Sequence, residues 1–399
     1  MHPMPLQAIS FLLHAFVGWR LVPALGSVPA GVALALVLAV SALTLPHGLG
    51  ARRGARGRRA ALLAWVGLVC MGFFSSLLVL SLGRDLALLV GAVVGAVRPG
   101  TIDLAALTVP SARAVAIAAV LVTLWGFVNA RRTARVVRVD VPVAGLPAGL
   151  DGFTIAQVSD VHVGPTIKRP FVEAIVATVN ALDADLVAIT GDLVDGSVAD
   201  LADDVAPLAG LRSKEGSFFV TGNHEYYSGA DAWVRQLRHL GLRVLINEHV
   251  VVRRGDAQLV VAGITDFSAA HFDRGRASDP AAALAGSPAG AVRLLLAHQP
   301  RSATAAEAAG FDLQLSGHTH GGQFLPWNFL VRLQQPFTAG LHRWRRMWVY
   351  TSRGTGYWGP PKRFGAPSEI TLLRLVAVPA ATTQEVAASA LGRAALPAV

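Results

Sequence analysis

Seven residues of metal-ligand types stand in the second half of the chain, each shortly after an apolar run. They are Asp160 and His162 in QVSDVHVG, Asp192 in ITGDLVDG, Asn223 in VTGNHEYY, His298 in LLAHQP, and His318 and His320 in LSGHTHGGQ. A mixed set of imidazole, carboxylate and amide groups is typical of borderline divalent ions and does not choose among them. One ion cannot take seven ligands, whereas two ions roughly 3.5 to 4 Å apart that share a carboxylate would use them all.

The spacing within two of these motifs suggests how their side chains converge. One residue separates Asp160 from His162, and one separates His318 from His320. Residues i and i+2 of an extended chain point to the same side, so we predict that both members of each pair reach inward. The glycines after both pairs let the backbone turn close to a ligand.

Each motif alone has a simpler interpretation. Asp-x-His is commonly a loop end, Gly-Asp-x-x-Asp a turn closed by an Asx hydrogen bond, and a single His298 a core histidine. GNHE and GHTH are more specific, and all five motifs in one domain favour a metal centre. Asp195 is left out of the ligand set, and we expect it to order the loop after Asp192 through a backbone hydrogen bond.

Short β-type runs alternate with helical ones from Val136 onward, which is typical of an α/β domain. The predicted strands are 153–159, 186–190, 218–220, 259–264, 292–297, 312–315 and 347–351, and the predicted helices are 169–182, 230–240 and 303–309. Active sites of open α/β sheets gather at the carboxyl ends of strands, where these motifs fall.

The chain as a whole is too apolar for a soluble enzyme of its size, with a mean hydropathy of +0.49 and 53% hydrophobic residues, and the long apolar runs stand in its opening third. Residues 6–25, 29–45, 61–83 and 114–130 are each long enough to cross a hydrocarbon core of about 30 Å as helices. Residues 86–97 are apolar but short, which favours an interfacial or re-entrant segment over a fifth crossing, although five crossings stay open.

The net charge of +10 does not indicate nucleic-acid binding. Thirteen arginines against two aspartates stand in the first 138 residues, and the rest of the chain has 22 basic and 23 acidic residues. Arginines beside apolar segments orient helices in a bilayer, and the loops around residues 52–59 and 131–138 are therefore predicted to be cytoplasmic. Cys70 is the only cysteine, so a disulfide or zinc-thiolate site within one chain is excluded.

The motifs DxH, GDxxD, GNHE, H and GHTH, with TSRGTGYWGPPKRFGAPSEI, give the region from about Asp140 to Leu375 its resemblance to a known family. It resembles the calcineurin-like metallophosphoesterases, and among them the membrane-associated YkuE/YaeI-type branch. The resemblance implies a four-layer αββα sandwich of two mixed sheets, preceded by a helical transmembrane region. The expected domains are 1–138 (membrane), 139–378 (metallophosphoesterase) and an Ala-rich tail, 379–399.

The resemblance also implies a role for each motif. Asp160, His162 and His320 would bind one divalent ion, Asn223, His298 and His318 the other, and Asp192 would bridge them, with Mn, Fe, Zn or a similar metal in each place. His224 is similar to the family histidine that contacts the phosphoryl or leaving-group oxygen. The implied reaction is phosphodiester or diphosphate hydrolysis by a hydroxide that bridges the ions.

Two further expectations concern the residues that bind the substrate phosphate and a segment that contacts lipid. Arg353 and Arg363 flank a Gly- and Pro-rich loop and are predicted to grip a phosphate as forked donors. Residues 324–348 mix aromatic side chains and arginines, and we expect them to lie against lipid and admit an amphiphilic substrate, unless Trp344 and Trp348 are fully buried.

The predicted partners are therefore a bilayer and a phosphate-containing, lipid-linked substrate such as a UDP-acylated sugar or a phospholipid, with no nucleic acid. The predicted location is the bacterial inner membrane, multi-pass, with the catalytic domain in the cytoplasm. A catalytically silent membrane regulator that keeps this fold is the alternative function. Transport is disfavoured, because the charges nearest the apolar segments, Arg20, Arg84 and Asp85, lie near segment ends.

Overall fold

The computed structural model describes residues 3–50 and 57–379, which form two units. The helical unit comprises the chain up to Arg131 together with Gly359–Phe364, and the α/β unit comprises Arg132–Trp358 together with the chain from Gly365 on. The return of Gly359–Phe364 to the helical unit was not expected from the sequence. The predicted Ala-rich tail lies outside the described residues except for its first residue.

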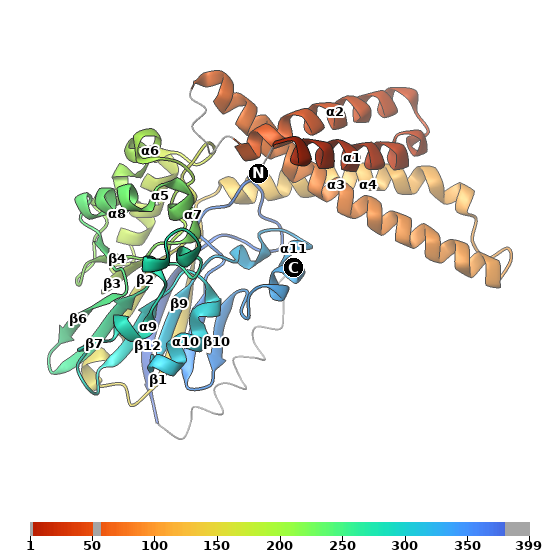
Figure 1. Cartoon of the computed structure of the whole chain (residues 1–399). Helices are drawn as coiled ribbons and strands as arrows, with labels where there is room; N and C mark the ends of the chain where they lie inside the picture. Colours follow the sequence, from red (N-terminus) through yellow and green to blue (C-terminus); the bar gives the residue numbers. More distant parts are fainter. Residues whose placement is uncertain (1–2, 51–56, 380–399) are drawn as a thin grey trace. The chain divides into compact units, whose positions relative to one another are not determined.

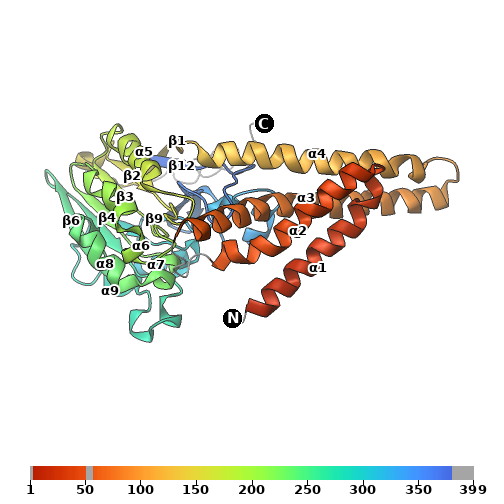
Figure 2. The ribbon, with the colours of Figure 1, turned by 90° about the horizontal axis from the view of Figure 1, so that it is seen from above.

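Four long apolar helices make up the described part of the helical unit. They are α1 (Pro3–Leu21), α2 (Val28–Gly50), α3 (Arg58–Val97) and α4 (Leu104–Arg131). Each is long and apolar enough to cross a membrane, in agreement with the four predicted crossings. Figure 2 shows α3 and α4 as an antiparallel hairpin, and small side chains such as Ala112 and Ala119 are buried where the helices meet.

The prediction of a separate re-entrant segment at 86–97 is wrong, because α3 continues unbroken for 40 residues, and an interfacial position of these residues stays a prediction. The polar pair at its middle does not end the helix, since neighbouring helices satisfy it. The Arg84 guanidinium donates to Ser111 Oγ at 2.9 Å and to the Thr108 carbonyl at 3.1 Å. The Asp85 carboxylate accepts two hydrogen bonds of 2.8 Å from Arg20.

Residues Gly359–Phe364 join the helical unit through α3 and α4. The Lys362 ammonium donates to the Gly72 carbonyl at 2.9 Å and to Ser76 Oγ, and the Arg363 backbone N–H donates to the Gly126 carbonyl at 2.8 Å. A Cβ atom at Gly126 would lie 2.7 Å from Lys362 Cγ. Small residues on both helices therefore make room for this segment.

Two six-stranded mixed sheets form the α/β unit (Figure 1). The first has the order β1 (Arg135–Ala144), β12 (Glu369–Val378), β2 (Thr154–Val158), β3 (Leu186–Ile189), β4 (Ser217–Phe219), β5 (Arg243–Val244). The second has the order β10 (Gly340–Trp344), β11 (Met347–Thr351), β9 (Leu313–Ser316), β8 (Val292–Leu296), β7 (Ala257–Gly263), β6 (Glu248–Arg254). Only β12–β2, β10–β11 and β6–β7 pair antiparallel, so most strand ends point the same way within each sheet.

The main core lies between the sheets, with side chains such as Ile155 and Phe218 from the first and Leu294 and Trp348 from the second. Helices cover the outer faces: α5 (Arg169–Asn180), α6 (Val198–Val205) and α8 (Ala230–His239) belong with the first sheet, and α9 (Pro280–Ala283) and α10 (Ala303–Ala309) with the second (Figure 1). In α10, Ala303 and Ala306 are buried against the second sheet. The predicted αββα sandwich is confirmed.

All seven predicted strands and all three predicted helices are present, with ends shifted by at most two residues. The sequence reasoning missed the other five strands, β1, β5, β6, β10 and β12. Half of β1 is exposed, and Asp140 on it pairs with Arg374 on β12 at 2.7 Å, so its charged residues obscured the strand pattern.

Candidate metal centre

The predicted ligands follow the carboxyl ends of five strands. Asp160 and His162 follow β2, Asp192 follows β3, Asn223 begins α7 (Asn223–Ser228) after β4, His298 follows β8, and His318 and His320 follow β9. All of them are buried except His318, which is half-buried. The sequence-based prediction that strand ends assemble these residues is confirmed.

The backbone at the ligands is not extended, so the predicted alternation of side chains is wrong. Five of the seven ligands have left-handed backbone, with φ of 53° at Asp160, 56° at His162, 51° at Asp192, 70° at His318 and 51° at His320. Such a conformation costs of order 1 kcal/mol or more at a residue other than glycine. Strain concentrated at these positions is typical of a functional site, where the surrounding fold holds the side chains in place.

Glycines before the ligands bring the loops together more closely than other residues would allow. A Cβ atom at Gly222 would lie 2.2 Å from Asp192 Oδ1, and one at Gly317 would lie 2.1 Å from Asp160 Oδ2. Gly191 has φ of 85° directly before Asp192. These glycines precede their ligands, whereas the sequence analysis singled out the glycines that follow.

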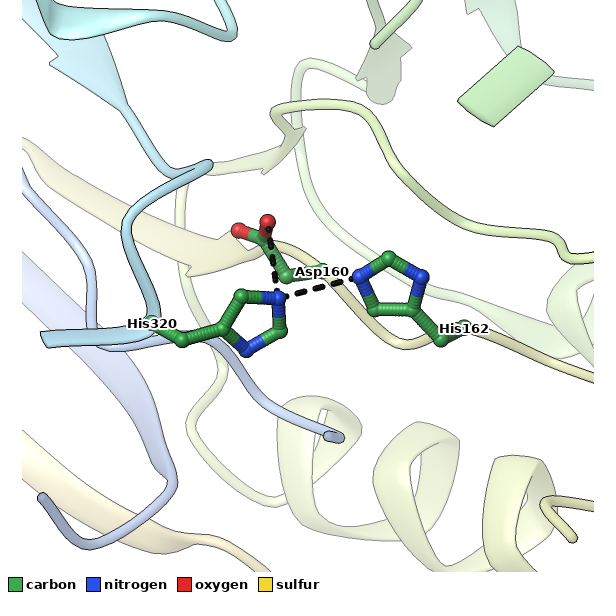
Figure 3. A group of neighbouring side chains, drawn as sticks. All are labelled: Asp160, His162 and His320. Carbon is green, nitrogen blue, oxygen red and sulfur yellow. Dashed lines mark hydrogen bonds and ion pairs between the residues drawn. The ribbon is translucent and has the colours of Figure 1, made fainter. Parts of the chain in front are cut away.

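One candidate metal group consists of Asp160, His162 and His320 (Figure 3). His320 Nε2 lies 3.0 Å from His162 Nε2 and 3.5 Å from Asp160 Oδ1. Two imidazole nitrogens that face each other at this distance next to a carboxylate form a natural cation site, because each nitrogen can act as a metal ligand. The structure thus brings together the three residues predicted for the first ion.

A second candidate group consists of Asp192, His298 and His318. His298 Nε2 lies 3.2 Å from Asp192 Oδ2 and 3.1 Å from His318 Nδ1. The Nδ1 atom of His298 lies 2.8 Å from the Thr190 carbonyl and can donate to it, which leaves Nε2 as the ligand atom. His318 and His320 therefore belong to different groups, although they are two residues apart.

Asp192 stands between the groups. Its Oδ2 lies 3.9 Å from His162 Nε2 of the first group and 3.2 Å from His298 Nε2 of the second. Its Oδ1 accepts the His224 backbone N–H at 2.9 Å. Asn223 lies beside it, and the buried Oδ1 of Asn223 has no hydrogen-bond partner among the described residues. A buried amide oxygen without a donor fits a metal ligand.

His224 and Asp195 add a charged pair at the edge of the ligand set. His224 Nε2 lies 3.8 Å from Asp192 Oδ2, and its Nδ1 is hydrogen-bonded to Asp195 Oδ1. Asp195 Oδ1 also lies 3.3 Å from His162 Nδ1. The prediction that Asp195 acts only by ordering a loop is therefore incomplete, because its carboxylate orients two imidazoles with their Nε2 atoms toward Asp192.

Glu225 is a site residue that the sequence reasoning missed. Its fully buried carboxylate accepts backbone N–H groups of Gly222 at 2.6 Å, Asp192 at 3.0 Å and Leu193 at 2.8 Å. Glu225 thus fixes the loops after β3 and β4 against each other. Its position three residues after the helix cap at Gly222 is the acidic position of a capping box, a signal present in GNHE.

Burial and neighbouring charges shift the pKa values of the predicted ligands Asp192, His298 and His318. Burial acts on Asp192, but the positive charges of His224 and His298 outweigh it and hold the pKa of Asp192 well below its usual value. Burial and the His298 charge lower the pKa of His318 to about 3. Asp192 is therefore anionic and His318 neutral near neutral pH, the forms in which each binds a metal. At His298, burial is outweighed by the charges of Asp192 and Asp160, which raise its pKa well above the usual value, so metal binding there displaces a proton.

The two predicted phosphate-binding arginines lie in different surroundings. The Arg353 guanidinium donates to Glu369 at 2.8 Å and is partly exposed. Arg363 is buried in the segment that joins the helical unit. Their contact with a phosphate stays a prediction.

Four other histidines of the α/β unit belong to neither metal group: His239, His249, His271 and His342.

Comparison with known proteins agrees with this site. The model of the calcineurin-like phosphoesterase family matches residues 153–322, which include all the ligands. A Danio rerio protein described as a transmembrane protein with metallophosphoesterase domain is 40% identical over 266 residues, or 65% of this chain and 61% of that protein. Uncharacterized metallophosphoesterases of Aquifex aeolicus and Bacillus subtilis (YkuE) are 32% and 30% identical over 60% and 58% of this chain, and over 91% and 81% of their own lengths.

The chain belongs to the metallophosphoesterase family, with a calcineurin-like phosphoesterase domain. It spans only 61% of the length of the Danio rerio relative and of a similar protein from Bos taurus. The chain thus combines a calcineurin-like phosphoesterase domain with candidate metal groups and four helices of membrane-spanning length.

Proposed function

We propose that this chain is a membrane-anchored phosphoesterase with two divalent ions, which hydrolyses phosphodiester or diphosphate bonds. The observation that carries the proposal is the position of Asp192, within 3.9 Å of a histidine nitrogen in each of two ligand groups. Asp160, His162 and His320 would hold one ion, Asn223, His298 and His318 the other, and Asp192 would contact both. Such ions supply positive charge for the phosphoryl oxygens and lower the pKa of water.

The remaining residues serve the same reaction. His224 has one nitrogen held by Asp195 and the other directed toward Asp192, so it is placed to donate a proton or hydrogen bond to the leaving oxygen. Asn223 is a neutral ligand and limits the negative charge where an anionic substrate must bind. Arg353 and Arg363 remain our candidates for additional phosphate contacts.

The substrate class proposed is a lipid-linked or amphiphilic phosphate, such as a UDP-acylated sugar or a phospholipid. The support is the presence of four membrane-length helices in the same chain as the metal groups, since tethering raises access to substrates that reside in the bilayer. We further propose a bacterial inner membrane with the catalytic domain in the cytoplasm. Strong activity of a reporter that works only outside the cytoplasm, fused after Arg138, would contradict this orientation.

The test of the proposed activity uses the full chain in detergent with bis(p-nitrophenyl) phosphate and p-nitrophenyl phosphate. Metal is removed with a chelator and restored with Mn²⁺. We expect diester hydrolysis that disappears with chelator and returns with Mn²⁺. Tight binding of two ions without turnover on either ester, with the protein in detergent or in vesicles, would instead favour a catalytically silent regulator.

A further inference from the structure

An exposed apolar segment, residues 325–333, directly follows the loop that carries His318 and His320. It includes α11 (Trp327–Leu330) and a turn of 3-10 helix, Val331–Leu333, and neither contains a buried residue. Phe329 is 61% exposed, Leu330 48% and Leu333 85%. Leaving such side chains in water forgoes the free energy that their burial would contribute, so a cluster of them indicates a surface that contacts something apolar.

The segment is held firmly against the metal loop. A Cβ atom at Gly322 would lie 2.1 Å from the Asn328 Cα, so the backbone of α11 packs directly on the turn after His320. The Gln323 side chain donates to the Trp358 carbonyl at 2.8 Å and accepts the Trp358 backbone N–H at 2.8 Å. Whatever residues 325–333 contact is therefore kept at a fixed distance from the candidate metal centre.

Part of the region predicted to lie against lipid, residues 324–348, is buried in the α/β unit and cannot contact lipid. Trp348 is buried in the core and its indole N–H donates to the Pro142 carbonyl at 2.7 Å, so the prediction is wrong for this residue. Trp344 is half-buried and packs against Phe337. Within the predicted region, the most exposed apolar side chains lie in residues 325–333.

The charge near residues 325–333 favours their binding to an anionic surface. Residues 324–348 contain four arginines and no aspartate or glutamate, and one of the four, Arg345, pairs with Glu307 at 3.2 Å. Arg332 is exposed and lies between Leu330 and Leu333. Short helical segments with Trp, Phe and Leu beside basic residues bind the boundary between lipid headgroups and acyl chains.

The chain itself also leads from this segment to membrane-length helices. Phe324 pairs with Gly365, and Leu325 side-chain atoms lie 3.0 Å from the position of a Cβ at Gly365. The residues directly before Gly365 are Gly359–Phe364, which pack with α3 and α4. A second copy of the chain is a weaker partner, because a stable protein interface takes roughly 20 to 30 residues a side and this segment has nine.

We propose that residues 325–333 insert into the surface of the bilayer that the four helices span, with Phe329, Leu330 and Leu333 in the acyl boundary. The insertion itself does not depend on the phosphoesterase activity. Its consequence for catalysis rests on the proposed function: phosphate groups at the lipid surface would come to the candidate metal centre, whereas soluble esters would not need the segment.

The first experiment places a polarity-sensitive fluorophore on the full chain in vesicles of phosphatidylcholine and phosphatidylglycerol. Leu333→Cys is labelled in a Cys70→Ala background, and Asp256→Cys, in an exposed turn, is the matched control. Lipids with a quencher on the acyl chain should quench the label at 333 several-fold more strongly than the label at 256. Equal quenching at the two positions would overturn the proposal.

The second experiment compares hydrolysis of a phosphodiester lipid in vesicles with hydrolysis of soluble bis(p-nitrophenyl) phosphate. Phe329→Ser with Leu333→Ser should lower lipid hydrolysis at least about tenfold and leave the soluble ester unchanged, since each buried side chain contributes about a factor of ten or more to partitioning. Equal loss on both substrates would mean that the segment only supports the site. Quenching at 333 in a protein that hydrolyses neither substrate would refute the proposed function and leave the insertion standing.

Discussion

The two units each contain a cluster of buried and half-buried polar side chains, and the clusters are built differently. In the helical unit, Arg84 has 4% of its side chain exposed, and its guanidinium meets Ser111 and the Thr108 carbonyl, while Asp85 meets Arg20. In the α/β unit, imidazoles face other imidazoles, at 3.0 Å in one group and 3.1 Å in the other.

The difference separates a structural cluster from a ligand cluster. Every buried cation of the helical cluster faces an acceptor supplied by the protein, so the cluster satisfies itself. In the α/β cluster, imidazole nitrogens face each other, and Asn223 Oδ1 has no hydrogen-bond partner among the described residues. Bound cations would supply the partners that these atoms lack. Substitutions in the two clusters should therefore affect different properties of the protein.

The largest effect on hydrolysis is expected for Asp192→Ala. Because Asp192 lies next to both ligand groups, its loss should abolish diester hydrolysis and reduce the number of bound ions. The measurements are metal content by mass spectrometry and turnover at saturating Mn²⁺. Full metal content with normal turnover would show that Asp192 does not link the two groups.

His224→Ala should lower kcat by about 10² to 10⁴, the usual contribution of a general acid, without loss of bound metal. His271→Ala is the matched control, because His271 is exposed and lies in neither group. Loss of one bound ion together with loss of activity would instead show that His224 is a metal ligand. His162, Asp192 and His224 do form a third candidate metal group.

Asp195→Asn should have a smaller effect, a loss of about 10- to 100-fold in metal affinity or activity, as is typical when the partner of a metal-binding histidine is changed. The amide cannot accept from both His162 and His224 with the strength of a carboxylate. Titration with Mn²⁺ and measurement of kcat/KM would check this. Unchanged affinity and unchanged kcat/KM would show that the contacts of Asp195 with the two imidazoles have no functional weight.

Asp85→Asn should leave hydrolysis of the soluble diester unchanged and lower stability by about 1 to 3 kcal/mol, since Arg20 and Arg84 lose a charged acceptor. Thermal unfolding in detergent measures the loss, and Asp103→Asn, an exposed change near the start of α4, is the control. A drop in turnover larger than that of Asp195→Asn would contradict a purely structural role for the helical cluster.

Much of the α/β unit could be predicted because its signals are local. Buried strands such as Leu186–Ile189 are continuous apolar runs, and ligands directly after them must meet at a sheet edge. The left-handed backbone at Asp160 and His320 could not be predicted: Asp and His adopt it more often than most residues, but tertiary contacts decide at which positions they do so. The role of Asp195 toward His162 and His224 was missed for a similar reason, since it depends on contacts with residues 33 and 29 positions away in the chain.

The sequence by itself determined the ligand types, their order along the chain and the four membrane-length helices, because these follow from residue chemistry and apolar length. Residue types and spacing left open which ligands share a group; the family resemblance implied it, and the tertiary structure places His318 with His298 and His320 with His162. It also decided that Arg84 and Asp85 stay inside one helix and that Gly359–Phe364 packs with α3 and α4. Those outcomes depend on which distant groups supply hydrogen bonds and space, and folding brings those groups together.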